Sequence, residues 1–218
     1  MTSKTSKTST TSRAARLTEQ AHREHLNDVR REQAAADRRR RRLRLAAWVG
    51  GLAVVAAVLT TMAVTSRPES SAATRVAPDF TLIDTSGNQV HLAGLRGHNV
   101  LLYFSEGAGC QACLVQMAEL EKNATLARAG VRVLPIVMNT RDQITNDMAA
   151  NGVKTPFLLD NGTVSRAYGT LGKGMHAGLP GHSFVLIDKD GIQRWYGDYP
   201  SMWLSTADLM SEINKHLA

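Results

Sequence analysis

The only two cysteines of this chain are Cys110 and Cys113, separated by Gln111 and Ala112. Two thiols at this spacing lie one helical turn apart, so they can close a disulfide and provide the attacking and resolving thiols that disulfide exchange requires. A structural bridge across so short a loop would stabilise the fold by only about 2 kcal/mol. A structural zinc site needs more ligands than two cysteines supply. The spacing therefore predicts redox chemistry, with a structural bridge and metal binding as the alternatives.

The segments around the pair predict how its two thiols differ. An apolar run at 99–104 predicts a buried strand, and a helical pattern begins at Gln111. Cys110 then lies at a helix N-terminus, where unpaired backbone N–H groups and the helix dipole favour the thiolate. A thiolate is the species that attacks disulfides. We therefore predict that Cys110 is the nucleophile and that Cys113 resolves the mixed disulfide.

The remainder of the C-terminal part alternates between strand and helix patterns. Apolar and alternating runs predict strands at 79–83, 89–92, 99–104, 131–137, 184–187 and 193–196. Helical spacing predicts helices at 111–129, 141–150 and 206–217, with Ser205 or Thr206 as the cap of the last helix. Strand–helix–strand order followed by a hairpin and a final helix predicts an α/β sandwich with a mixed sheet.

Three segments resemble a known group of proteins. Residues 77–104, APDFTLIDTSGNQVHLAGLRGHNVLLYF, resemble the opening of TlpA-type and AhpC/TSA-type thioredoxin-like proteins. Residues 155–169, TPFLLDNGTVSRAYG, are similar to a peroxiredoxin segment, and residues 182–195, HSFVLIDKDGIQRW, to the late strand–turn–strand of both groups. The resemblance implies a thioredoxin-like three-layer α/β/α sandwich with a mixed central sheet and the cysteine pair at its first helix.

The residues around the cysteines depart from the thioredoxin pattern. Thioredoxins carry Trp before the first cysteine and often Gly-Pro between the two, whereas this chain has Gly109 there and Gln111-Ala112 between them. The intervening dipeptide tunes the reduction potential. Whether the protein reduces or oxidises its partners therefore stays open.

The chain also departs from the peroxiredoxin pattern. Peroxiredoxins carry Thr or Ser three residues before the peroxidatic cysteine, Pro seven before it, and Arg three before the Phe of the late strand. This chain has Gly107, Tyr103 and Gly181 at these positions. Three groups that hold and polarise a peroxide are therefore missing. A thiol peroxidase using Cys110 remains the alternative enzyme, but we expect little such activity.

The resemblance places a substrate groove at Pro180 and Gly181. Thioredoxins have a cis-proline beside the cysteines, just before the late strand, and Pro180 is its natural counterpart. Pro180 lies four residues before Phe184, where the family pattern suggests three. Either the loop is one residue longer here, or the cis position is lost.

Two histidines are expected near the cysteines because His176 lies in the Gly-rich loop 169–181 and His182 follows it. Two cysteines with a histidine resemble the copper site of Sco-type metal-delivery proteins, although those usually space the cysteines by three residues. A copper-delivery module is thus a third hypothesis. The ordinary alternative is a solvated or hydrogen-bonded histidine, and our main prediction includes no metal or cofactor.

An uncharged stretch at 46–64 predicts a transmembrane anchor. Its nineteen residues span about 28 Å as a helix, close to the ~30 Å hydrocarbon core of a bilayer. Arg38–Arg42 and Arg44 precede it, whereas only Arg67 follows closely. The positive-inside rule then places the N-terminus in the cytoplasm and the redox domain outside, in a single-pass protein of the cell membrane. A cleaved signal peptide is the alternative, although the segment before the apolar run is unusually long for one.

Charge separates the tail from the domain. Residues 1–45 hold 13 Lys and Arg against 5 Asp and Glu, a net charge of +8, and residues 46–218 hold 13 against 14, a net charge of −1. No base-reading pattern accompanies the basic tail, so we expect no nucleic-acid partner. We expect disorder in 1–12, helix in 13–44, a linker at 65–75 and the redox domain at 76–218. The expected partners are protein thiols or disulfides outside the membrane and a transmembrane thiol electron carrier.

Overall fold

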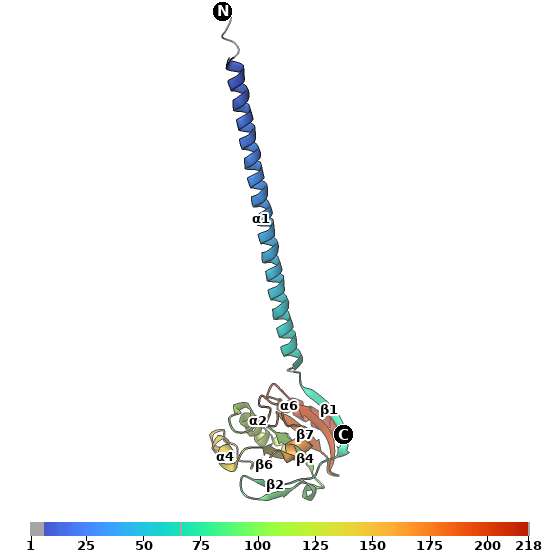
Figure 1. Cartoon of the computed structure of the whole chain (residues 1–218). Coiled ribbons are helices and arrows are strands. Elements are labelled where there is room, and N and C mark those ends of the chain that lie inside the picture. The colour runs from blue at the N-terminus through green and yellow to red at the C-terminus, as the bar shows by residue number, and fades with distance from the viewer. Residues whose placement is uncertain (1–6, 66, 218) are drawn as a thin grey trace, which may run out of the picture. The chain divides into compact units, whose positions relative to one another are not determined.

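The computed structural model describes residues 7–65 and 67–217 (Figure 1). The chain divides into two units, Met1–Thr61 and Met62–Ala218. Helix α1 (Lys7–Thr65) accounts for the described part of the first unit. All strands and the remaining helices belong to the second unit.

Helix α1 is longer than the sequence predicted. It begins at Lys7, so residues 7–12 are helical, which is one of the two states expected for the tail, while residues 1–6 lie outside the described part. Extending an existing helix costs far less free energy than nucleating one, which explains the continuation into polar sequence. The large apolar side chains between Leu43 and Val64 are all more than half exposed. Within the described residues, the stretch Arg30–Val64 is the one helical segment long and apolar enough to cross a membrane.

The second unit is built on one mixed sheet with the strand order β1-β8-β7-β4-β5-β6-β2-β3. The strands are β1 (Glu69–Val76), β2 (Thr81–Asp84), β3 (Gln89–His91), β4 (Asn99–Phe104), β5 (Val131–Val137), β6 (Leu158–Leu159), β7 (Ser183–Ile187) and β8 (Ile192–Asp198). Strand β4 pairs in parallel with β5 and antiparallel with β7. The mixed sheet that the element order predicted is therefore confirmed.

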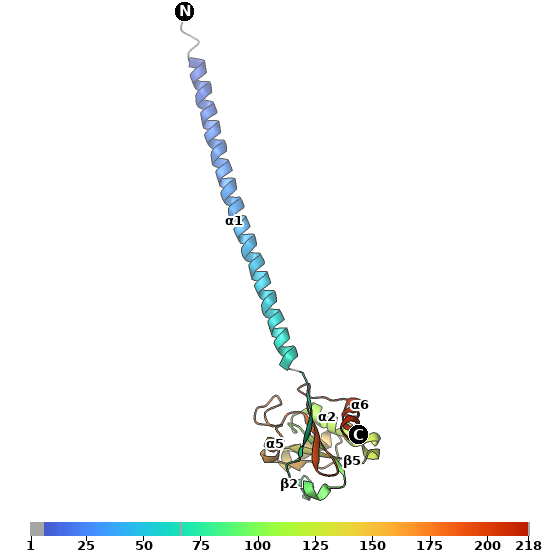
Figure 2. The same ribbon diagram turned by 90° about the vertical axis from the view of Figure 1, so that its right-hand side faces the viewer.

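Helices cover both faces of this sheet. They are the 3₁₀ helix η1 (Leu92–Leu95) and the α-helices α2 (Gln111–Lys122), α3 (Ala124–Arg128), α4 (Arg141–Ala150), α5 (Thr163–Ala167) and α6 (Thr206–Leu217). Figure 2 shows α5 on one side of the sheet and α6 on the other. Strand β4 contributes to the hydrophobic core on each face of the sheet, because alternate side chains point to opposite faces. Leu101 and Tyr103 pack on the side of α2, and Leu102 and Phe104 on the side of α5. The predicted α/β sandwich is confirmed.

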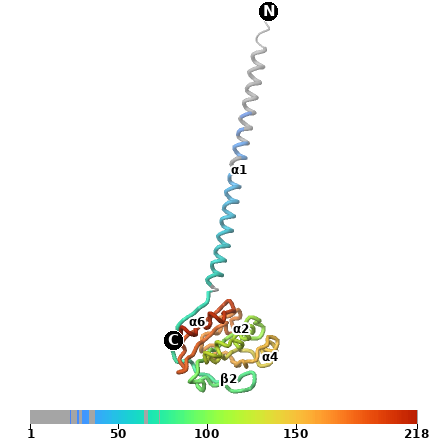
Figure 3. Tube along the Cα trace, turned by 180° about the vertical axis from the view of Figure 1, so that it is seen from behind, coloured from blue at the N-terminus to red at the C-terminus, as the bar shows by residue number. Residues whose placement is uncertain are grey.

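Two parts of the second unit differ from the sequence-based expectation. The predicted linker 65–75 is wrong for its second half, since Glu69–Val76 forms strand β1 along the edge of the sheet beside β8 (Figure 3). The predicted helix 111–129 is two helices. Helix α2 ends at Lys122, and the Asn123 side chain caps α3 by accepting the backbone N–H groups of Thr125 and Leu126.

Candidate active site

The cysteine pair lies at the start of α2, as predicted, and it is oxidised. Cys110 and Cys113 form a disulfide, with their Cα atoms 5.3 Å apart. Cys110 is the N-cap of α2, and its sulfur accepts the backbone N–H of Cys113 at 3.3 Å. A backbone donor aimed at this sulfur stabilises negative charge on it. Cys110 is 8% exposed and Cys113 only 1%, which suits an attacking and a resolving thiol respectively.

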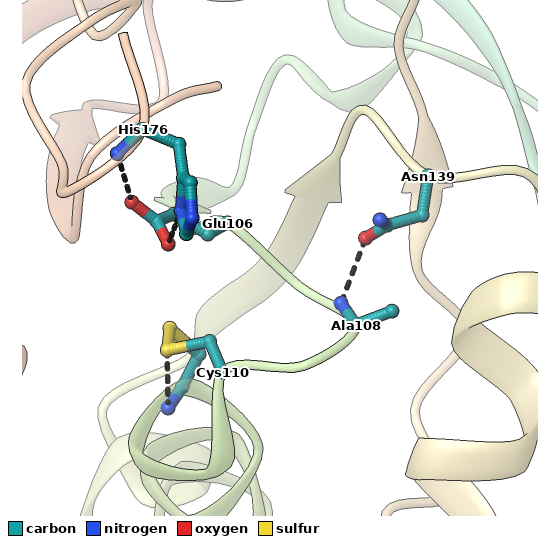
Figure 4. Close-up of polar contacts among 6 residues, drawn as sticks. Glu106, Ala108, Cys110, Asn139 and His176 are labelled. Atoms are coloured by element: carbon teal, nitrogen blue, oxygen red, sulfur yellow. Dashed lines mark hydrogen bonds and ion pairs between the residues drawn. A yellow bond between two sulfur atoms is a disulfide. The ribbon is translucent and has the colours of Figure 1, made fainter. Parts of the chain in front are cut away.

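The loop between β4 and α2 is fixed from the neighbouring β5–α4 region. Asn139 accepts the backbone N–H of Ala108 through its side-chain oxygen at 2.9 Å, as Figure 4 shows, and Asp147 accepts that of Gly109 at 2.8 Å. Gly107 has a left-handed backbone with φ of +76°. A Cβ atom at Gly107 would lie 2.0 Å from Oδ1 of Asn139 and 2.8 Å from Cγ1 of Val137. The position that carries Thr or Ser in peroxiredoxins is therefore closed to any side chain in this conformation.

A buried carboxylate lies in the same loop. Glu106 is only 3% exposed. One of its oxygens accepts the backbone N–H of His176 at 3.0 Å, and the other lies 2.8 Å from Nδ1 of that imidazole (Figure 4). Glu106 was not among the predicted site residues. A carboxylate four residues before the first cysteine, within a Gly-rich loop, was the available signal.

Two aromatic rings lie beneath the first turn of α2. The Tyr103 hydroxyl is 3.1 Å from the backbone oxygen of Cys113 and 3.2 Å from Nδ1 of His182. Both side chains are buried, and the Tyr103 ring stacks on Phe184. Burial lowers the pKa of His182 to about 4 and raises the pKa of Tyr103 well above its usual value. Both groups are therefore neutral at physiological pH. His182 is linked to the backbone of Cys113 through the Tyr103 hydroxyl, which contacts both.

Pro180 and Gly181 do not line an open groove. Both residues are buried, and a Cβ atom at Gly181 would lie 2.6 Å from Cβ of Lys173. Among the described residues no peptide bond is cis. The alternative, that the cis position is lost, is the one the structure adopts.

The histidines occupy separate environments. His176 pairs with Glu106, whereas His182 contacts Tyr103. The described part of the chain contains no group of three or more His, Cys, Asp or Glu side chains placed to hold a metal ion.

The sequence profile of the AhpC/TSA family matches residues 73–196. Peroxiredoxin Bcp of Escherichia coli is 32% identical over 132 residues, which are 57% of this chain and 84% of that protein. The thiol-disulfide oxidoreductase ResA of Bacillus thuringiensis is 31% identical over 117 residues, 53% of this chain and 63% of that protein. A crystal structure of reduced 2-Cys peroxiredoxin from Plasmodium vivax superposes with a TM-score of 0.57 at 20% identity, over 66% of this chain and 96% of that one. The chain therefore belongs to the AhpC/TSA family and has a thioredoxin-like redoxin fold.

Proposed function

We propose that this protein is a membrane-anchored thiol–disulfide oxidoreductase that cycles Cys110 and Cys113 between dithiol and disulfide outside the cytoplasm. The observation that carries the proposal is the disulfide at the start of α2, with the Cys113 N–H aimed at the Cys110 sulfur. Such a pair supplies both thiols of an exchange reaction within one molecule.

The reaction balances as two successive exchanges. The Cys110 thiolate attacks one sulfur of a client disulfide, so a Cys110–client bond forms while the client bond breaks and one client sulfur leaves as a thiolate. The Cys113 thiolate then attacks the Cys110 sulfur and releases the second client thiolate. The client gains two electrons and two protons, and the pair becomes the disulfide. A dithiol partner, such as a transmembrane thiol carrier, reverses these steps to restore the dithiol. Run backwards on a client dithiol, the same exchanges oxidise the client.

The proposed location rests on the exposed apolar part of α1 and the charges beside it. Exposed apolar side chains such as Leu52 and Leu59 suit the interior of a bilayer. Arg38–Arg42 lie before the apolar stretch, and such a cluster is typical of the cytoplasmic side. This orientation puts the redox domain in a compartment where disulfides persist.

Trapping of clients tests the proposal. Cys113→Ser in the full-length membrane protein should accumulate mixed disulfides with client proteins, since Cys110 attacks and nothing resolves the adduct. Cys110→Ser should accumulate none, and the double serine variant is the control for unspecific capture. Equal trapping by Cys110→Ser would show that the nucleophile is misassigned. If neither variant traps a client or alters disulfide turnover, the proposed function is wrong.

A further inference from the structure

A short segment covers the position where the thioredoxin pattern has its substrate groove. We call residues 172–178 the strap. The Gly172 N–H donates to the Leu179 oxygen at 2.8 Å, and the Leu179 N–H donates to the His176 oxygen at 3.0 Å, which closes the strap on itself. A bridge between Leu171 and Pro180 joins its two ends. The strap is therefore a compact hairpin-like loop rather than an extended connection.

One end of the strap lies directly on Gly181. A Cβ atom at Gly181 would lie 2.6 Å from Cβ of Lys173, 2.8 Å from the Lys173 carbonyl carbon and 3.0 Å from the Gly174 nitrogen. Lys173 also forms an ion pair with Glu69 of β1 at 3.0 Å, but both side chains are well exposed, so the pair contributes little stability. Close packing against Gly181, rather than this ion pair, places the strap over the groove position.

The centre of the strap is held by Glu106. Its carboxylate accepts the backbone N–H of His176 and pairs with the imidazole, and it is almost fully buried while the His176 side chain is 66% exposed. A Cβ atom at Gly174 would lie 2.3 Å from Oε1 of Glu106, so a side chain here would displace the carboxylate from its present position. Hydrogen bonds to an ionised carboxylate are stronger than neutral ones. Glu106 is thus the main latch of the strap.

This latch lies within the active-site loop. Glu106 is four residues before Cys110, and Figure 4 shows its side chain and the disulfide on the same side of that loop, with His176 beyond the carboxylate. The Cys110 residue that must meet a client is only 8% exposed. The strap is therefore tied to the same loop that carries the sulfur of Cys110.

We infer that Glu106 is a specificity-determining residue: by latching the strap, it restricts which thiols and disulfides reach Cys110. A protein partner that offers its own N–H or cationic groups to Glu106 can displace His176 and lift the strap. A reagent without such groups must wait for spontaneous opening. The inference rests on the proposed function and identifies the kind of partner that the site accepts.

The test measures how fast dithiothreitol reduces the Cys110–Cys113 disulfide in the full-length protein in detergent, together with hydrogen exchange of the strap amides. Glu106→Ala should raise the reduction rate by about tenfold or more, because it removes charge-assisted hydrogen bonds that hold the closed state. The strap amides should exchange faster in the same variant. His176→Ala keeps one backbone hydrogen bond and should give a smaller increase in both. Glu106→Gln preserves an acceptor and should restore most of the wild-type behaviour.

The matched control is Glu121→Gln, another carboxylate that accepts a backbone N–H from a distant segment, that of Lys154 at 2.9 Å. It should leave both the reduction rate and the strap exchange unchanged. An unchanged reduction rate in Glu106→Ala would overturn the inference. So would a faster rate with unchanged strap exchange, because Glu106 would then act on the sulfur charge alone. Neither result depends on client trapping, so a failure of the proposed function is detected separately.

Discussion

The hydroxyl of Tyr103 donates a hydrogen bond to the backbone oxygen of Cys113 at 3.1 Å, from the strand that lies beneath the active-site helix. Since the hydroxyl proton is directed to that oxygen, Nδ1 of His182 donates to the hydroxyl at 3.2 Å. The second cysteine is therefore held from below by two neutral, buried rings. This support fixes the helix turn from which, in the proposed function, Cys113 attacks the mixed disulfide.

Tyr103→Phe should destabilise the fold by about 1–3 kcal/mol, because it leaves the buried Nδ1 of His182 without a partner. It should also slow the resolution of a mixed disulfide severalfold, since the Cys113 turn loses its support. Denaturant unfolding of the full chain in detergent and stopped-flow resolution kinetics measure the two effects.

The matched control for that substitution is Tyr168→Phe. Tyr168 donates to the Pro78 oxygen at 2.7 Å on the other face of the sheet. Loss of this hydrogen bond should lower the free energy of unfolding by about 1 kcal/mol. It should leave the rate at which the mixed disulfide is resolved unchanged. Equal kinetic effects of the two substitutions would contradict a positioning role for Tyr103.

His182 should make stability depend on pH in the acidic range. Burial lowers its pKa to about 4 in the folded protein, compared with about 6.5 in an unfolded chain. The unfolded state therefore binds the proton first, so the contribution is complete above about pH 6.5 and is lost as the pH falls toward 4. The free energy of unfolding should fall by about 3 kcal/mol at most through this group.

Unfolding free energies measured from pH 7 to pH 4 check this dependence. His182→Gln should flatten the slope relative to the wild type. Identical slopes in the wild type and His182→Gln would show that His182 is not the group responsible.

The elements buried on both faces could be predicted from sequence. Strands β4 and β5 are rich in apolar residues, with Asn99 and Arg132 as the polar exceptions, and both match the predicted bounds. Strand β1 could not be predicted, because Glu69–Val76 is largely polar and its partner β8 is more than 100 residues away in sequence. Trp195 of β8 donates to the Ser70 hydroxyl at 2.8 Å. Strand formation there depends on long-range pairing rather than on local propensity.

For the candidate site, the position of the cysteine pair could be predicted from sequence, but the contacts around it could not. The spacing of Cys110 and Cys113 and the helix pattern after them were sufficient to place the disulfide at the start of α2. The contact between Glu106 and His176 joins loops 70 residues apart, and no local pattern reports such a pairing. The groove at Gly181 was inferred from the resemblance to thioredoxins, and the strap that covers this residue has no periodic signal that could have predicted it.

The proposed membrane anchor predicts a defined topology. In spheroplasts, added protease should degrade an epitope at the C-terminus and spare a tag at the N-terminus, because the arginine cluster precedes the apolar stretch. Permeabilised cells, in which both tags are accessible, are the control. Protection of the C-terminal epitope in intact spheroplasts would reverse the orientation, and its release into the medium would indicate cleavage after 64.

Gly107 predicts a low peroxidase activity. The full chain should consume hydrogen peroxide no faster than a small dithiol at equal thiolate concentration, because no hydroxyl side chain can stand at this position. Gly107→Thr should not restore activity. It should instead destabilise the fold by about 3 kcal/mol, from a left-handed backbone that disfavours a Cβ atom and from the lost bond between Ala108 and Asn139.

Gly109→Thr separates these two causes of destabilisation. Gly109 has a similar φ of +86°, but a Cβ atom there would meet nothing within 4 Å. This variant should therefore lower the free energy of unfolding by only about 1–2 kcal/mol, the cost of placing a Cβ atom on a left-handed backbone. Denaturant unfolding of the two variants gives the comparison, and a cost for Gly107→Thr no larger than that for Gly109→Thr would show that the Asn139 contact is unimportant. A peroxide rate constant orders of magnitude above that of the small dithiol would instead assign Cys110 as a peroxidatic cysteine held by groups other than those of peroxiredoxins.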